Sequence, residues 1–334
     1  MNWLINFWYS KNNAFSLLLL PFHLVIYCLV YLRQLAYRVN LLKSTKINVP
    51  VIIVGNITLG GTGKSPVVIH LAERLSASGY KIGVLSRGYG GASSNYPLEV
   101  TRNSLPDEVG DEPLMIKNRL DASVVVDPIR ARGANYLVEH CASDLIICDD
   151  GLQHYALQRD MEILVLDETR GVGNGLLIPF GPLRESVGRL KSVDAIVLNG
   201  SINKSLDKNT FALTIKSDCF VSVKDSNKHL DVEQFKQMIH AKQLDMVAAI
   251  GNPKRFFDQL GELGLAGRQH QYIDHHTFIS DDFKAMNSII IMTEKDAVKC
   301  AAFATEDMWY LKVDGQIQPS LVDYCLSLLE KKGA

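Results

Sequence analysis

The chain has 334 residues, a formal net charge of −1, and 47% hydrophobic against 21% charged residues. This length allows two domains with separate cores. The near-neutral charge argues against a nucleic-acid partner, because such proteins concentrate basic residues. The six cysteines are dispersed, with no CxxC pair and no metal-ligand spacing. Such cysteines in a nucleotide-binding chain indicate a reducing cytosol.

Residues 1–46 are predicted to form a membrane-associated N-terminal helix. Residues 15–32 (FSLLLLPFHLVIYCLVYL) carry no formal charge over eighteen positions, which is just long enough to span a thin bilayer. A signal peptide is not expected, since no small-residue cleavage site follows. The segment either spans the membrane or lies in its interface, which we favour, and a buried core helix is the alternative. Basic residues just downstream place the rest of the chain on the cytoplasmic side; they are Arg33, Arg38, Lys43 and Lys46.

A phosphate-binding loop is predicted at residues 51–66 (VIIVGNITLGGTGKSP). Residues 51–54 form an apolar, β-branched run typical of a buried parallel strand. A strand, a glycine loop, Lys-Ser and a helix together are the context that a P-loop requires. Thr58 stands where the usual pattern has its first glycine. Phosphate contacts are expected from the loop, with the Ser65 hydroxyl also on Mg²⁺; the loop residues are Gly60, Gly61, Thr62, Gly63, Lys64 and Ser65.

A second nucleotide-site signal is the run DLIICDDGLQH at residues 144–154. It predicts an apolar strand ending in the carboxylates Asp149 and Asp150. In P-loop proteins a carboxylate at this strand tip lies beside the P-loop and holds the metal or its waters. The metal site is therefore predicted at Ser65, Asp149 and Asp150, with a weak preference for Asp150 as the direct ligand.

Further strands at 81–86, 122–126, 163–166 and 195–198 predict a P-loop NTPase-like parallel α/β sheet within residues 47–210. Loops at the carboxyl ends of such strands bind ligands. Arg87 and Tyr89 of the SRGYG loop are therefore candidate ligand contacts. In VGDEP, Asp111 opens a helix, and from the motif alone it is either a compensator of the helix dipole or a functional carboxylate. Residues 171–184 (GVGNGLLIPFGPLR) have the composition of a substrate loop.

Residues 211–334 are predicted to form a second, smaller α/β domain with a closing helix at 319–329. The β-like runs at 211–223 and 308–313 flank this unit. If they pair, they form a strand connector between the two domains.

The chain resembles the tetraacyldisaccharide 4′-kinase family, also called lipid A 4′-kinases, over essentially its whole length. The resemblance rests on motifs in a specific order: GNITLGGTGKSP, SRGYG, VGDEP, DDGLQH, GNGLLIPFGPLRE, IGNP, the Asp-His of YIDHHTF, and MTEKDAVK. It implies a kinase that uses ATP and Mg²⁺ at the cytoplasmic face of the inner membrane. The implied acceptor is the 4′-hydroxyl of a tetraacylated glucosamine disaccharide 1-phosphate.

The resemblance also implies roles for single residues. Asp111 would be the catalytic carboxylate and His275 its partner, since His275 and not His276 directly follows Asp274. Because this pair would join the two domains, the domains are expected to close around substrate to form it. The run Thr293-Glu294-Lys295-Asp296 superficially resembles a guanine-reading motif, but it matches a family signature without an assigned role and GTP is not predicted. Contacts to nucleotide or substrate phosphates would come from Tyr89, Arg130, His154 and Arg184.

The residues leave one function of a different class open. The same P-loop and Asp-Asp pair could serve a membrane-tethered ATPase or GTPase switch that transfers phosphate only to water. A kinase differs from it in ATP turnover that depends on an acylated disaccharide.

Overall fold

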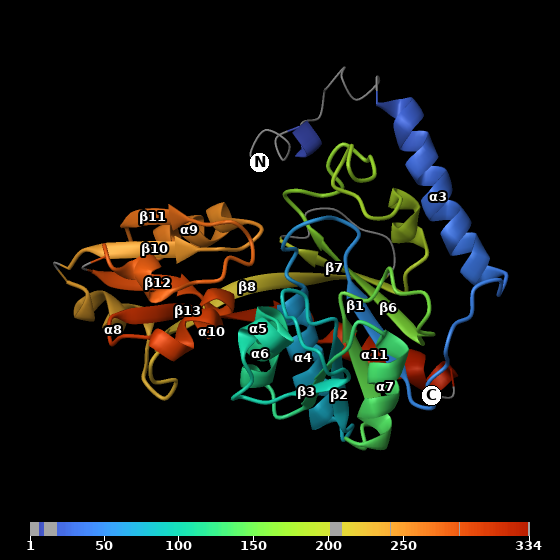
Figure 1. The fold of residues 1–334 in the computed structure, drawn as a ribbon, viewed down its shortest axis with the longest axis horizontal. Helices are drawn as coiled ribbons and strands as arrows, with labels where there is room; N and C mark the ends of the chain where they lie inside the picture. Colours follow the sequence, from blue (N-terminus) through green and yellow to red (C-terminus); the bar gives the residue numbers. More distant parts are fainter. Residues whose placement is uncertain (1–6, 10–18, 201–208, 241, 287, 333–334) are drawn as a thin grey trace.

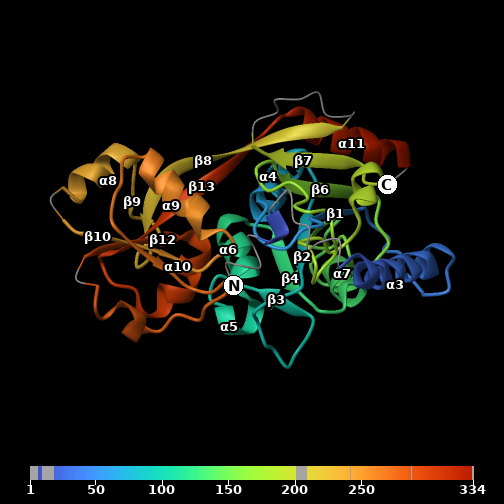
Figure 2. The same ribbon diagram turned by 90° about the horizontal axis from the view of Figure 1, so that it is seen from above.

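The computed structural model describes residues 7–9, 19–200, 209–240, 242–286 and 288–332. One sheet runs through the whole molecule in the order β11-β10-β12-β13-β8-β7-β6-β1-β5-β2-β4-β3, with β9 beside β8. Figures 1 and 2 show its two halves as separate lobes joined by the long strands β8 and β13. The predicted mixture of a parallel-sheet unit and a smaller α/β unit is confirmed.

The larger lobe carries the predicted P-loop sheet. Its strands are parallel except β3, which pairs antiparallel with β4, and all residues of β1, β2 and β5 are buried. Its elements are β1 (Val51–Gly55), α4 (Lys64–Ala77), β2 (Ile82–Ser86), β3 (Leu98–Val100), α5 (Pro106–Val109), α6 (Asp111–Arg119), β4 (Ser123–Val126), α7 (Arg130–Glu139), β5 (Leu145–Asp149), β6 (Met161–Asp167) and β7 (Ala195–Asn199).

The order of these strands places a ligand site at the end of β1. β2, β4 and β5 all lie on one side of β1, with β5 directly beside it, and the chain then crosses to β6 on the other side. In open α/β sheets the crevice at such a reversal, beyond the carboxyl ends of the strands, is where ligands bind. The P-loop follows β1 and the Asp-Asp pair follows β5 at this edge.

The smaller lobe has its own core around Phe220, Phe235 and Trp309. The predicted connector is confirmed, because β8 and β13 pair antiparallel from Leu213–Ile317 to Ser222–Trp309 with a register shift between Lys312 and Val313. The elements of this part are β8 (Thr210–Ser222), β9 (His229–Leu230), α8 (Val232–Met238), β10 (Leu244–Ala248), α9 (Pro253–Glu262), β11 (Arg268–Gln271), β12 (Ile289–Thr293), α10 (Glu294–Cys300) and β13 (Met308–Ile317).

The closing helix α11 (Ser320–Lys332) returns to the larger lobe (Figure 2). Its buried side chains Leu321, Cys325 and Leu329 join the core formed by α4 and the P-loop sheet. The sequence alone groups this helix with the smaller unit. The structure corrects that grouping, because the apolar face of α11 is covered by the larger lobe.

The N-terminal helix α3 (Leu20–Arg38) lies along the outside of the larger lobe (Figure 1). Residues 15–18 of the predicted apolar segment lie outside the described residues. One face of α3 contacts the lobe: Ile26 and Val30 pack against the core beneath, and the Leu177 N–H donates to His23 Nδ1 at 3.2 Å. The outward face leaves large apolar side chains exposed, namely Phe22, Leu24, Val25, Leu29 and Leu32.

Candidate active site

The P-loop is held in shape by two asparagines. Asn56 Nδ2 donates to the Gly60 carbonyl at 3.3 Å and to Thr62 Oγ1 at 3.2 Å. From β7, Asn199 Nδ2 donates to the Thr62 carbonyl at 2.9 Å. Gly63 has a φ of 94° and no room for a Cβ, which would come within 2.6 Å of Asn199 Nδ2. Glycine is therefore needed where the loop turns into α4.

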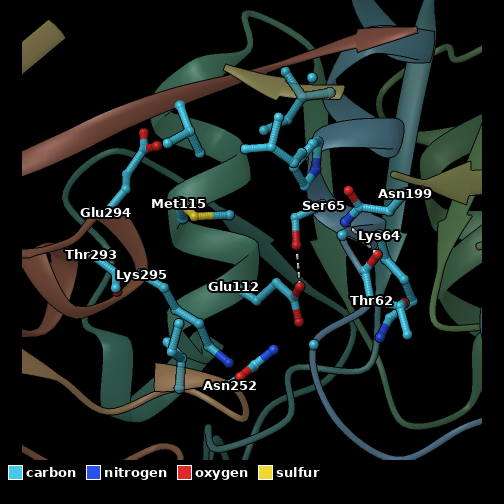
Figure 3. Close-up of a pocket in the computed structure, with 18 of the residues that line it drawn as sticks. Thr62, Lys64, Ser65, Glu112, Met115, Asn199, Asn252, Thr293, Glu294 and Lys295 are labelled. Carbon is cyan, nitrogen blue, oxygen red and sulfur yellow. Dashed lines mark hydrogen bonds between the residues drawn. The ribbon is translucent and has the colours of Figure 1, made fainter. Parts of the chain in front are cut away.

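Beyond the P-loop, a cavity of about 950 Å³ separates the two lobes. Figure 3 shows Lys64, Ser65 and Glu112 on one side and Asn252 and Lys295 on the other. The smaller lobe approaches closely, because a Cβ on Gly251 would lie 3.2 Å from the Gly60 Cα. Several predicted residues line this cavity: Gly60, Gly61, Thr62, Gly63, Lys64, Ser65, Tyr89, Asp150, Arg184 and His275.

The two carboxylates of the Asp-Asp pair have different surroundings. Asp150 faces cations, with Lys64 Nζ at 3.8 Å and Arg184 Nη1 at 2.8 Å. Burial would raise the pKa of Asp150, but these cations lower it to about 2. Asp149 is buried, and its Oδ1 has no hydrogen-bond partner among the described residues. Burial and the nearby Glu112 carboxylate raise the pKa of Asp149 to about 8.

Glu112 joins this group from the first turn of α6. The Ser65 hydroxyl donates a short hydrogen bond to Glu112 Oε1 (Figure 3). No three His, Cys, Asp or Glu side chains of the described residues form a ready-made metal site. Mg²⁺ is typically held by one or two carboxylates, with waters and substrate phosphates completing its shell. An unpartnered Asp149 oxygen and the Ser65–Glu112 pair beside Lys64 fit such an ion.

Asp111 and His275, which are 164 positions apart, meet across the lobes. His275 Nδ1 lies 3.0 Å from Asp111 Oδ2, and the Glu112 N–H donates to Asp111 Oδ1 at 2.8 Å. His275 has a φ of 60°, which is uncommon for a residue with a Cβ. The Tyr89 ring packs edge-on against the imidazole, with 4.8 Å between centroids.

Two lysines of α10 surround the buried Asp111 carboxylate. Lys295 Nζ lies 3.9 Å and Lys299 Nζ 4.0 Å from Asp111 Oδ2. Burial would raise the pKa of Asp111, but the hydrogen bond from His275 and the lysine charges hold it below its ordinary value. Asp111 is therefore ionised, as a carboxylate that is to accept a proton must be.

Behind the Asp-Asp pair lies a group of cationic side chains. Arg130 is 3% exposed and donates from Nη2 to the Asp149 carbonyl at 2.9 Å. Its Nε and Nη1 find no partner within the described part of the chain. Burial and the charges of Arg130 and Arg87 lower the pKa of His154 to about 4, so this imidazole is neutral. Unpaired donors of a buried guanidinium suit an anionic ligand.

The structure thus brings together most of the predicted residues but differs from the sequence interpretation in detail. Asp149, Arg130 and His154 are not among the residues that line this cavity. Sequence reasoning missed Glu112, Lys295 and Lys299 as parts of the site. Glu112 had a signal, since it follows Asp111 in VGDEP, and both lysines belong to the MTEKDAVK motif. Asn199 carries no local signal, because only the fold brings it to the P-loop.

Comparison with known proteins agrees with this geometry. A family model described as tetraacyldisaccharide-1-P 4′-kinase (LpxK) matches residues 15–330. The chain is 45% identical over 332 residues to a tetraacyldisaccharide 4′-kinase of Methylobacillus flagellatus, covering 98% of this chain and 96% of the relative. A relative of the same description from Pseudoalteromonas atlantica is 46% identical over 299 residues. This match covers 89% of this chain and 95% of the relative.

A solved structure is also similar. The crystal structure of LpxK from Aquifex aeolicus in complex with ATP superposes with a TM-score of 0.80 at 27% identity, covering 94% of this chain and 99% of that one. The matches of sequence and structure extend over both lobes. The chain therefore belongs to the tetraacyldisaccharide 4′-kinase family.

Proposed function

We propose that this protein transfers the γ-phosphate of Mg²⁺-bound ATP to the 4′-hydroxyl of a tetraacylated glucosamine disaccharide 1-phosphate, a step of lipid A biosynthesis. The observation that carries the proposal is the Asp111–His275 pair, which the lobes bring to 3.0 Å beside the P-loop cavity. A switch that acts on water needs no such base between two lobes. Family membership supports the same acceptor.

Each of these residues has its own proposed role in the reaction. Asp111 accepts the proton of the sugar hydroxyl, and the hydroxyl oxygen forms a bond to the γ-phosphorus. The bond between that phosphorus and the bridging β–γ oxygen breaks, and ADP leaves. Lys64 and the P-loop N–H groups bind the phosphates and stabilise the charge on the transferring group. His275 holds the Asp111 carboxylate in place.

Ser65, Glu112 and Asp149 are the side chains proposed to hold Mg²⁺. The ion, when bound, neutralises phosphate charge. Asp150 is better suited as the counterion of Lys64 and Arg184, because both cations already contact it. Arg130, with two unpaired donors, is proposed to bind a substrate phosphate together with Arg87 and the neutral His154. Tyr89 would contact the acceptor beside His275.

Helix α3 is proposed to seat the enzyme on the cytoplasmic face of the inner membrane. Of the described residues, α3 is the one helix long and apolar enough to cross a bilayer. Because one face of α3 contacts the larger lobe, insertion of its outward face into the interface is favoured over a full span. The basic residues in the last turns of α3 and just after it would add about 1 kcal/mol each on anionic lipid. The proposed units are 1–46, 47–210 and 211–334, with α11 completing the P-loop unit.

The test is transfer of radiolabelled phosphate from ATP to a tetraacylated disaccharide 1-phosphate, followed by thin-layer chromatography. We expect a labelled lipid product, no product from Lys64→Ala, and little ATP hydrolysis without the lipid. Rapid lipid-independent hydrolysis without a labelled product would favour the switch instead.

A further inference from the structure

Lys295 is a buried cation that contacts the proposed catalytic pair. Its Nζ lies 3.3 Å from His275 Nε2, on the side of the ring opposite Asp111. The same Nζ lies 3.7 Å from Asp274 Oδ1. Figure 3 shows the side chain extending from the start of α10 into the cavity. This contact belongs to the Thr293–Asp296 motif, whose role the reaction outlined above leaves unassigned.

The contact fixes where the imidazole proton resides. A lysine ammonium has three hydrogens to donate and no acceptor. Burial would lower the pKa of Lys295, but the carboxylates of Glu112, Asp111, Asp274 and Asp296 raise it above its ordinary value. Lys295 is therefore the donor, and His275 Nε2 must accept with its lone pair. In the singly protonated ring, the proton then lies on Nδ1, which points at Asp111 Oδ2.

The other members of the motif hold Lys295 in this position. Thr293 Oγ1 caps α10 by accepting from the Asp296 N–H at 3.1 Å, and Asp296 Oδ2 accepts from the Ala249 N–H at 3.0 Å. Arg119, at the end of α6, binds both oxygens of Glu294 at 2.6 and 2.7 Å. Asp111 is the first residue of α6, and Lys295 lies on α10. The Arg119–Glu294 pair therefore holds these two helices in a fixed position relative to each other.

We propose that Lys295 is a positioning residue for phosphoryl transfer, which holds His275 in the tautomer that donates from Nδ1 to Asp111. In the other tautomer, a nitrogen lone pair would face the carboxylate, and the two acceptors would repel each other. The carboxylate would then turn away from the acceptor hydroxyl. This inference rests on the proposed role of Asp111 as the base.

Lys299 provides a matched control. Its Nζ is 4.0 Å from Asp111 Oδ2, almost the same distance as for Lys295, so either change to methionine removes the same charge near the base. The contacts found for Lys299 are with Asp296, at 2.7 Å, and with the Phe278 ring. Lys299→Met therefore weakens the field at Asp111 without removing the donor to His275. Lys295→Arg keeps both the charge and a donor.

The experiment combines NMR and kinetics on the full-length protein. Two-bond ¹H–¹⁵N spectra of ¹⁵N-histidine-labelled protein in slightly alkaline buffer report the tautomer, and His275→Gln assigns the signal. We expect the Nδ1–H form in the wild type, Lys295→Arg and Lys299→Met, and its loss in Lys295→Met. The kcat of Lys295→Met should fall about 10²-fold with an unchanged KM for ATP, as expected for a misplaced catalytic group, and Lys295→Arg should recover most of it.

An Nε2–H tautomer in the wild type would overturn the inference even if Lys295→Met fails to fold. The inference is also wrong if Lys295→Met folds and keeps both the Nδ1–H form and its kcat. Failure of the proposed function has a different result, because the wild type would then give no labelled lipid whatever the tautomer of His275. If only the role of Asp111 as the base is wrong, Asp111→Asn would retain phosphate transfer to the lipid.

Discussion

At the scale of single residues, neighbouring identical side chains can have unlike roles. Asp149 and Asp150 are adjacent in sequence, but Asp150 has a φ of 48° and turns toward Lys64 and Arg184, whereas Asp149 faces inward. Because the backbone at Asp150 is in the left-handed region, the two successive carboxylates point toward different partners. The sequence predicted a metal site at this pair with only a weak preference for Asp150, and the contacts favour the opposite choice.

Asparagine substitutions should separate these roles. Asp149→Asn is expected to raise the Mg²⁺ concentration for half-maximal activity at least about tenfold, because it removes a carboxylate that would bind the ion. Asp150→Asn should change the Mg²⁺ requirement less and weaken ATP binding through a displaced Lys64. Magnesium titrations of initial rates at saturating ATP measure both. Equal, small effects would remove the pair from the metal site.

At the scale of elements, the edge of the smaller lobe depends on a buried charge. Asp245 of β10 is fully buried and accepts from Arg268 at 2.8 Å and His270 Nε2 at 2.7 Å, and also from Ser288. Burial would raise the pKa of Asp245, but these hydrogen bonds lower it. The ionised carboxylate therefore stabilises the fold above its unfolded pKa of about 3.9, and this contribution is lost as pH falls through the lower folded pKa.

Asp245→Asn should lower the free energy of unfolding at neutral pH by about 2 kcal/mol. The difference in unfolding free energy from the wild type should shrink as the pH falls below about 4, where the unfolded chain binds a proton that the folded carboxylate binds only at its lower pKa. Urea unfolding across this pH range measures it. Asp258→Asn, which loses only an exposed pair with Lys254, is the control and should change little. A gap that is constant with pH would contradict the assigned charge.

The strands could largely be predicted because the apolar runs are long and the sheet buries them on both faces. β3, β9 and β11 were missed. β3 and β9 are only three and two residues long, too short for a period to show, and β11 (RQHQ) has no apolar side chain. The residues of the site also fall into those that a local motif predicts and those that only the packing brings together. Lys64 and Asp111 belong to local motifs, whereas the contacts of Arg119 with Glu294 and of Asn199 with Thr62 join residues 175 and 137 positions apart and depend on how the elements pack.

At the scale of the whole molecule, residues of the two lobes contact one another across the cavity. The Asp111–His275 pair is formed, and Arg255 of α9 donates to Asn199 Oδ1 at 2.7 Å. Closure of the domains around substrate, which the sequence interpretation expects, stays a prediction. The lobes share one continuous sheet, because β8 and β13 are paired along nine positions.

The pair should act as one unit. Asp111→Asn is expected to remove nearly all phosphate transfer while ATP affinity stays roughly intact, and His275→Gln should cost less. The double variant should be little worse than Asp111→Asn alone, because members of one catalytic unit are not additive. Single-turnover rates and melting temperatures of the three variants measure this. Additive losses accompanied by lower melting temperatures would indicate two independent structural roles.

Membrane association should depend on the outward face of α3. Val25 and Leu29 are each 59% exposed on this face. The double change to Glu should abolish flotation with phosphatidylethanolamine–phosphatidylglycerol vesicles and leave ATP binding intact, because charged groups are costly in the acyl region. Leu105→Glu, at an exposed position just before α5 and so away from α3 (Figure 1), is the control. Undiminished flotation of the double variant would place the anchor elsewhere.

The return of α11 to the larger lobe has a consequence for biosynthesis. Leu321, Cys325 and Leu329 complete a core whose other buried side chains, apart from Ile317, belong to the first two thirds of the chain. A ribosome synthesises α11 only after the whole of the smaller lobe. The P-loop lobe therefore stays incomplete, with apolar surface uncovered, while the smaller lobe is synthesised. A released chain truncated after residue 319 should be readily cut by protease in the P-loop lobe and resist it in the smaller one.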